Sequence, residues 1–112
     1  MTNNRPGFPR VSFRIRRVYF DAIVRGEKNV EVRRMSPYWT RAVGRLRDDD
    51  MGRCGVAVFV CGHDVYECWI QGVRVEESAR DALGREPNEQ GRLDLGDGPV
   101  FAFELGAAVA SS

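Results

Sequence analysis

Apolar and polar residues alternate along this chain in a way that predicts five strands with short helices between them. Val11, Phe13 and Ile15 are separated by polar residues, which is typical of a strand with one buried face. The run from 55 to 61 is almost entirely apolar and favours a strand buried on both faces. Further strands are predicted at 29–34, 65–75 and 99–105, and short helices at 17–25, from Ser36-Pro37 onward and at 78–83.

The region 85–98 has no clear hydrophobic period and is predicted to be a long irregular loop, a kind of segment that often serves as a binding lid or is disordered. Five strands with two or three short helices at the rim indicate an α+β domain built on a small mixed β-barrel. The 112 residues suffice for one modest core. We therefore expect a single domain at 11–105, between a flexible N-terminal arm at 1–10 and a C-terminal tail at 106–112.

Nothing in the sequence suggests export or membrane insertion. No apolar run approaches the ~20 residues that a membrane-spanning helix needs. The first ten residues lack the apolar region of a secretory signal. A cytoplasmic location is expected.

The most unusual pattern is a polar strand face that follows the first predicted helix. Gly26 suits the left-handed backbone conformation just past a helix end. Because side chains alternate along a strand, Val30 and Val32 are expected to face the core. The opposite face would present an amide, a carboxylate and a guanidinium beside an ammonium, from Asn29, Glu31, Arg33 and Lys28. Such a row favours a wet groove that binds a polar ligand; the alternative is a solvated face whose ion pair contributes only ~0–1 kcal/mol.

This segment resembles the signature of ASCH domains, which are small barrels of the PUA-like superfamily. The ASCH pattern is an apolar helix, a Gly-x-Lys-Thr-x-Glu-x-Arg strand and a short helix that contains Trp. The residues that carry it here are Gly26, Lys28, Glu31, Arg33 and, in the next helix, Trp39. Asn29 stands where the family usually has Thr. The resemblance covers residues 11–43 and implies a PUA/ASCH-like barrel.

Charge is distributed unevenly between the two halves of the chain. Residues 1–53 hold twelve arginines and one lysine against six acidic residues, a net charge of +7. Residues 54–112 hold four arginines against ten acidic residues, a net charge of −6. This asymmetry indicates an anionic partner for the first half, because guanidinium groups bind phosphate and stack on bases. Two alternatives stay open: the halves neutralise each other in the fold, and a GC-rich genome enriches arginine.

These patterns together favour a domain that binds a nucleotide or a single-stranded RNA element. The groove would be lined by Lys28, Asn29, Glu31 and Arg33, and the phosphate track would extend along Arg14, Arg16 and Arg34. Aromatic rings near such a groove can stack on bases. Tyr38 is the better stacking candidate, because the helical spacing of Trp39 from Val43 favours a core position for the tryptophan.

Two other classes of function remain open. The first is a small hydrolase, either a ribonuclease or an acetylcytidine-type amidohydrolase, in which Lys28, Glu31 and Arg33 would serve as acid, base and phosphate clamp. The ASCH-like amidohydrolases use a Thr nucleophile three residues after the Lys, and Glu31 at that position removes the attacking hydroxyl. The second is a protein-interaction module that uses the acidic C-terminal half.

The cysteines and the single histidine do not predict a metal site. Cys54, Cys61, His63 and Cys68 lack the close Cys-x-x-Cys or His-x-x-x-His pairs of structural zinc sites. An odd number of cysteines also argues against a disulfide framework. We expect neither a metal nor a cofactor.

Overall fold

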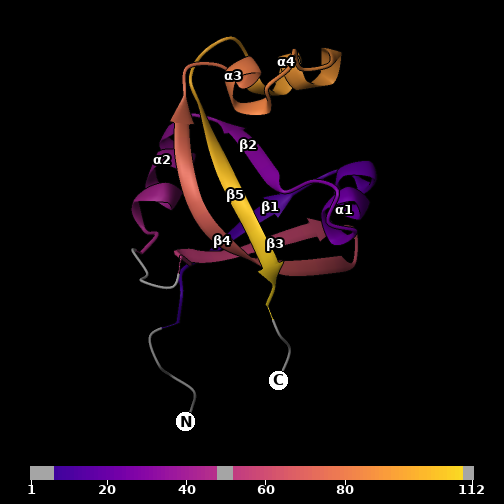
Figure 1. Cartoon of the computed structure of the whole chain (residues 1–112), viewed down its shortest axis with the longest axis vertical. Coiled ribbons are helices and arrows are strands. Elements are labelled where there is room, and N and C mark those ends of the chain that lie inside the picture. Colours follow the sequence, from indigo (N-terminus) through magenta and orange to yellow (C-terminus); the bar gives the residue numbers. More distant parts are fainter. Residues whose placement is uncertain (1–6, 48–51, 110–112) are drawn as a thin grey trace.

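Five strands form one curved mixed sheet with the order β1-β3-β4-β5-β2, and β1 and β2 are its two edges (Figure 1). The computed structural model describes residues 7–47 and 52–109. β1 pairs with β3 in parallel, and the other three pairings are antiparallel. The strands are β1 (Arg10–Arg14), β2 (Val30–Arg34), β3 (Gly55–Cys61), β4 (Asp64–Glu76) and β5 (Val100–Ala108). The predicted α+β class and mixed barrel are confirmed, in the form of a half-barrel.

Four short helices surround the sheet in the described part of the chain, rather than two or three. They are α1 (Arg17–Val24), α2 (Pro37–Gly44), α3 (Ala79–Leu83) and α4 (Glu89–Leu95). The additional helix, α4, lies in the region 85–98 that was predicted to be irregular. Asn88 caps α4 by accepting a hydrogen bond from the Gly91 backbone at 2.8 Å. No residue of α4 is buried, so its sequence carries no hydrophobic period that could reveal a helix.

The strand ends also differ from the sequence prediction. β1 begins at Arg10, which was assigned to the arm, and ends at Arg14, so Ile15 of the predicted alternation lies just beyond it. β5 continues to Ala108, into the predicted tail, because Ala108 pairs with Cys68 of the long strand β4. The remaining parts of the predicted arm and tail, residues 1–6 and 110–112, and the acidic loop residues 48–51 lie outside the described residues.

The strand β4 curves the sheet enough to pair with β3 along one half and with β5 along the other. Its register with β5 shifts between Cys68 and Ile70 and again between Ile70 and Gly72. Such bulges bend a strand and increase its twist. A Cβ atom at Gly72 would lie 3.0 Å from a carboxylate oxygen of Glu104, so glycine leaves room for this side chain, which accepts a hydrogen bond from Arg74.

The main core fills the concave side of the half-barrel. Phe13, Phe59 and Phe103 are fully buried there, and the rings of Phe13 and Phe59 stack with centroids 4.9 Å apart. Trp39 on α2 stacks on Phe13 with centroids 5.0 Å apart, which confirms the interpretation that it packs on the core. Two aromatic contacts of this kind each add about 0.5–1.5 kcal/mol to the burial itself.

A second, smaller core lies on the opposite face of β2 and β5. Val32 packs there with Val100 and Ala102, beneath Ala79 and Ala82 of α3. The predicted alternation along β2 is therefore confirmed: its valines face the second core, and its charged residues face the concave side. None of the helices in residues 7–47 and 52–109 is both long and apolar enough to cross a membrane.

Candidate functional site

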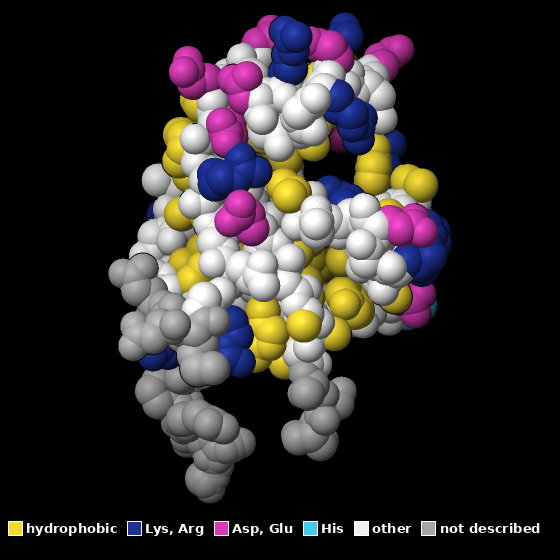
Figure 2. All heavy atoms as spheres, viewed as in Figure 1, with side chains coloured by type: hydrophobic (Ala, Val, Ile, Leu, Met, Phe, Trp, Pro, Cys, Tyr) yellow, Lys and Arg dark blue, Asp and Glu magenta, His cyan; other side chains and the backbone are white. Residues whose placement is uncertain are grey.

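A groove of about 1030 Å³ runs between the N-terminal part of α1, strand β2 and the α3–α4 segment. Figure 2 shows the hollow between the α3–α4 segment at the top and the body of the domain at the right. Seven of the eight predicted site residues line it: Arg14, Arg16, Lys28, Asn29, Glu31, Arg33 and Arg34. The eighth, Tyr38, is not among the lining residues. Its side chain is 54% exposed and packs edge-on against Trp39, with centroids 4.9 Å apart.

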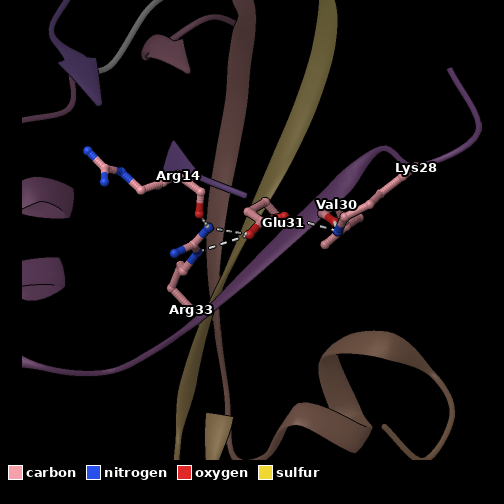
Figure 3. A network of polar contacts seen from close by, with 5 residues as sticks. All are labelled: Arg14, Lys28, Val30, Glu31 and Arg33. Carbon is pink, nitrogen blue, oxygen red and sulfur yellow. Dashed lines mark hydrogen bonds and ion pairs between the residues drawn. The ribbon is translucent and has the colours of Figure 1, made fainter. Parts of the chain in front are cut away.

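The floor of the groove contains a buried carboxylate. Glu31 is only 7% exposed and is the one buried charged residue in the part of the chain that the structure describes. Its Oε1 atom lies 3.1 Å from Lys28 Nζ, and its Oε2 atom lies 2.9 Å from both Nε and Nη2 of Arg33 (Figure 3). A buried carboxylate is tolerated when cations and hydrogen bonds replace the lost water. The strand face is therefore less wet than the sequence suggested, because the charges satisfy one another.

Arg33 joins the two open edges of the half-barrel. Besides its contacts with Glu31, its Nη2 atom donates a hydrogen bond to the backbone oxygen of Arg14 on β1 at 3.3 Å. The guanidinium carbon lies 5.2 Å from the ring centroid of Phe13 and 5.3 Å from that of Trp39. A cation in such a position over an aromatic ring is attracted by the ring quadrupole. One side chain thus links strand β2, strand β1 and the core beneath α2.

Lys28 is placed by the way the chain leaves α1. Gly26 has a φ of 78°, as predicted for a left-handed residue after a helix. The backbone amides of Glu27 and Lys28 both donate to the oxygen of Ala22, at 2.8 and 3.1 Å. The Lys28 ammonium then turns back to donate to the Val30 backbone oxygen and to pair with Glu31. The helix end and the glycine turn therefore fix the ammonium beside the carboxylate.

Three exposed arginines surround this buried network. Arg14, Arg16 and Arg34 line the groove, and none of them forms an ion pair with another described residue. Arg85 on the far wall is likewise exposed and forms no ion pair with a described residue. These four arginines are the cations best placed to bind an anion without first breaking an ion pair.

The far wall of the groove comes from α3 and α4; the sequence predicted a helix at 78–83 but neither α4 nor any site residue in this wall. Asn88, Asp94 and Leu95 contribute to this wall. Asp94 accepts a hydrogen bond from the Gln90 side chain at 2.9 Å. The signal that could have revealed the wall is the pair of helix-ending glycines, Gly84 and Gly96, both of which have positive φ.

The cysteines lie apart from this groove. Burial raises the pKa of the Cys68 thiol to about 11, so at neutral pH it is a protonated thiol in the core rather than a nucleophile. His63 is exposed in the turn between β3 and β4. Among the described residues, no three His, Cys, Asp or Glu side chains cluster closely enough to hold a metal ion. The expectation of no metal and no cofactor stays a prediction.

Comparison with solved structures identifies the fold. A point-mutant form of ZmASCH from Zymomonas mobilis superposes on 92% of this chain and 71% of its own chain, with a TM-score of 0.64 and 18% sequence identity. This chain has an ASCH-like fold. The resemblance predicted from the Gly26–Arg33 signature is thereby confirmed for the fold. No protein-family profile matches the chain, and no curated protein is detectably similar to it in sequence.

The ASCH-like fold gives the signature residues their positions on either side of β2. In this chain, the buried Glu31 and its two cations lie on the concave face, while the valines of the same strand face α3. Asn29, which replaces the usual Thr of the signature, precedes β2 and is exposed in the groove wall.

Proposed function

We propose that this ASCH-like domain binds a nucleotide or a single-stranded RNA element in the groove beside β2. The observation that carries the proposal is the charge of the groove lining, which includes six basic and three acidic side chains. Four of the basic side chains, those of Arg14, Arg16, Arg34 and Arg85, have no ionic partner among the described residues. Arginine on a concave surface is well suited to phosphate, because its donors form a planar fork.

The groove is large enough for a ligand of nucleotide size or larger. Small-molecule sites usually enclose about 300–1,000 Å³, so a groove of about 1030 Å³ has room for a nucleotide and for the neighbouring units of a strand. Single-stranded nucleic acid is bound by a cationic track combined with flat surfaces for its bases. The exposed arginines supply the track, and Trp39 and Arg33 offer flat surfaces in the same groove.

The proposal predicts an affinity for single-stranded RNA that falls as salt concentration rises. Each phosphate neutralised should contribute a slope of about −0.7 to the plot of log affinity against log salt. Contacts with three arginines would therefore give a slope of about −2. Fluorescence anisotropy of a labelled RNA hexamer at several salt concentrations measures this slope, and a titration with free mononucleotides tests whether one unit suffices. An affinity that does not depend on salt would point to the protein-interaction alternative instead.

A hydrolase that acts on RNA or on modified nucleosides is the second candidate. It is favoured by the position of Lys28, the one lysine among seventeen basic residues, whose ammonium is held against the buried Glu31 carboxylate at the groove. A catalytic base must give up its proton, which lysine can do and arginine cannot. The absence of a Thr at position 31 weighs against the amidohydrolase form of this alternative.

The substitution Lys28→Arg separates the two candidates. In a binding domain the variant keeps its charge and is expected to keep its affinity within about threefold, because phosphate attraction depends mainly on charge. Neither the wild type nor the variant should then release product from single-stranded RNA or from acetylcytidine. Turnover by the wild type that disappears in Lys28→Arg, with binding retained, would establish the hydrolase.

Three further expectations belong to this proposal. Residues 11–105 would act as one unit, the protein would work in the cytoplasm, and the acidic C-terminal half would be available to a protein partner. Asp81, Glu86 and Glu89 are exposed on the α3–α4 segment, on the side of the groove opposite the basic strand β2.

A further inference from the structure

We infer that the Arg33 guanidinium is a stacking platform for a nucleobase, so that the groove contains a base subsite formed by Arg33 and walled by Trp39. This inference rests on the proposed binding of a nucleotide or single-stranded RNA. It assigns to Arg33 a role different from that of the exposed arginines. The argument depends on which atoms of the guanidinium are already engaged.

The edge of the Arg33 guanidinium is largely occupied. Nε donates a hydrogen bond to Glu31 Oε2 at 2.9 Å, and Nη2 forms an ion pair with the same oxygen at 2.9 Å while donating to the Arg14 backbone oxygen at 3.3 Å. Hydrogen bonds of a guanidinium lie in its plane, so contacts from two nitrogens fix the orientation of that plane. An arginine that binds phosphate in a two-pronged contact uses two of its nitrogens, and every such pair that Arg33 can offer includes Nε or Nη2. Arg33 cannot offer a two-pronged contact without giving up a contact with Glu31 or Arg14, and Nη1 alone can make a single-pronged one.

Charge also disfavours a phosphate at this point. The Glu31 carboxylate lies directly against the Arg33 edge and is shielded from water. A phosphate approaching that edge would meet the carboxylate at short range, where burial weakens dielectric screening. A neutral flat ring does not meet this repulsion. It interacts with the face of the cation, and Arg guanidinium planes are known surfaces on which single-stranded bases stack.

The platform is rigid because the core supports it. The guanidinium lies over Phe13 and Trp39, and Phe13 is itself fully buried between Trp39 and Phe59. The Arg33 side chain is 23% exposed, and both Arg33 and Trp39 line the groove. The exposed part of the guanidinium therefore reaches the groove while the aromatic core and Glu31 hold the rest of it in place. A rigid surface stacks a base without the entropy cost of ordering a mobile side chain.

The groove then divides into two parts with different chemistry. Arg14, Arg16 and Arg34 would contact phosphates, and Arg33 with Trp39 would contact a base. Removing a base from the ligand should weaken binding without changing the number of phosphates bound. Removing an exposed arginine should reduce the number of phosphates bound and weaken binding equally with and without bases.

The test compares an adenosine hexamer with a hexamer of the same length and phosphate count that lacks its bases. Base stacking in single-strand sites changes affinity by about 5- to 150-fold per base, so the wild type is expected to bind the base-bearing strand at least about tenfold more tightly. Arg33→Lys keeps a cation beside Glu31 but removes the planar group. It should bind the two strands within about twofold of each other, with an unchanged salt slope. Arg34→Ala is the matched control, which should weaken both strands equally and preserve their ratio.

A second measurement does not depend on the folding of an Arg33 variant. In a Trp69→Phe background the remaining tryptophan is Trp39, and its emission should change when the base-bearing hexamer binds but not when the abasic hexamer binds. Salt-dependent binding of both hexamers with equal affinity, or a base preference that survives Arg33→Lys, would overturn the platform while leaving the proposed function intact. Failure of both hexamers to bind at low salt would refute the proposed function itself, and the platform with it.

Discussion

Replacing Arg33 with alanine is expected to lower the free energy of unfolding by about 2–3 kcal/mol. The substitution removes the Nε hydrogen bond and the Nη2 ion pair to Glu31 Oε2, and leaves a carboxylate that is 7% exposed with Lys28 as its remaining cation. It also removes the contact between β2 and the Arg14 backbone, and the cation over Phe13. The retained Lys28 pair and the partial exposure of Arg33 keep the loss below the ~3–5 kcal/mol of a fully buried broken pair. Urea denaturation followed by circular dichroism measures the change.

Two controls make this result specific to the buried pair. Arg14→Ala leaves the backbone acceptor in place and removes only an exposed side chain, so it should change stability by no more than about 0.5 kcal/mol. Glu31→Gln in the Arg33→Ala background removes the unpaired charge and should restore part of the lost stability. Equal, small losses for Arg33→Ala and Arg14→Ala would mean that the network contributes no more than a surface ion pair.

Reversing the charge of two exposed groove arginines is expected to weaken RNA binding by about 100-fold or more. The double substitution Arg16→Glu/Arg34→Glu removes two phosphate contacts and places two carboxylates beside the strand, so both the lost attraction and the new repulsion act at short range. A 100-fold loss corresponds to about 2.7 kcal/mol. Neither side chain is paired with another described residue, so the fold should be unaffected.

The matched control changes the same net charge elsewhere. Arg41 and Arg45 are exposed at α2 and do not line the groove. Arg41→Glu/Arg45→Glu should reduce affinity by no more than about threefold at physiological salt, where screening acts over about 8 Å. Similar losses for the two double variants would show that overall charge, rather than the groove, attracts the ligand.

The sequence predicted the polar face of β2, but not that Glu31 on this face is buried and paired with Lys28 and Arg33. Alternation along the strand placed Val32 on one face and Glu31 and Arg33 on the other, and the structure has this arrangement. The burial of Glu31 depends on Phe13, Trp39 and the β1 edge, which come together only in the folded half-barrel. Residue spacing within one strand cannot show such a contact. For the same reason, the sequence could not show that the Arg33 edge is already occupied.

Helix α4 was missed for a different physical reason. Its residues pack so little against the rest of the domain that none is buried, and it contains Gly91, a poor helix former. Its capping residue Asn88 is a recognisable signal, but capping alone does not distinguish a helix from a turn. Strand β3, which lies inside the sheet, was predicted at the bounds observed, because burial leaves a continuous apolar run. Sequence reasoning thus identified the core elements and missed a surface element that forms one wall of the groove.

Amide NMR spectra recorded during titration with a short single-stranded RNA test the central claim most directly, because they show where the ligand lies. The account predicts that shift changes concentrate at residues 14–22, 27–39 and 82–95, which contain the groove lining. Saturating changes in these segments would place the ligand in the groove. Changes confined instead to the surface around Phe8 and Trp69, or an absence of changes at millimolar RNA, would contradict the account.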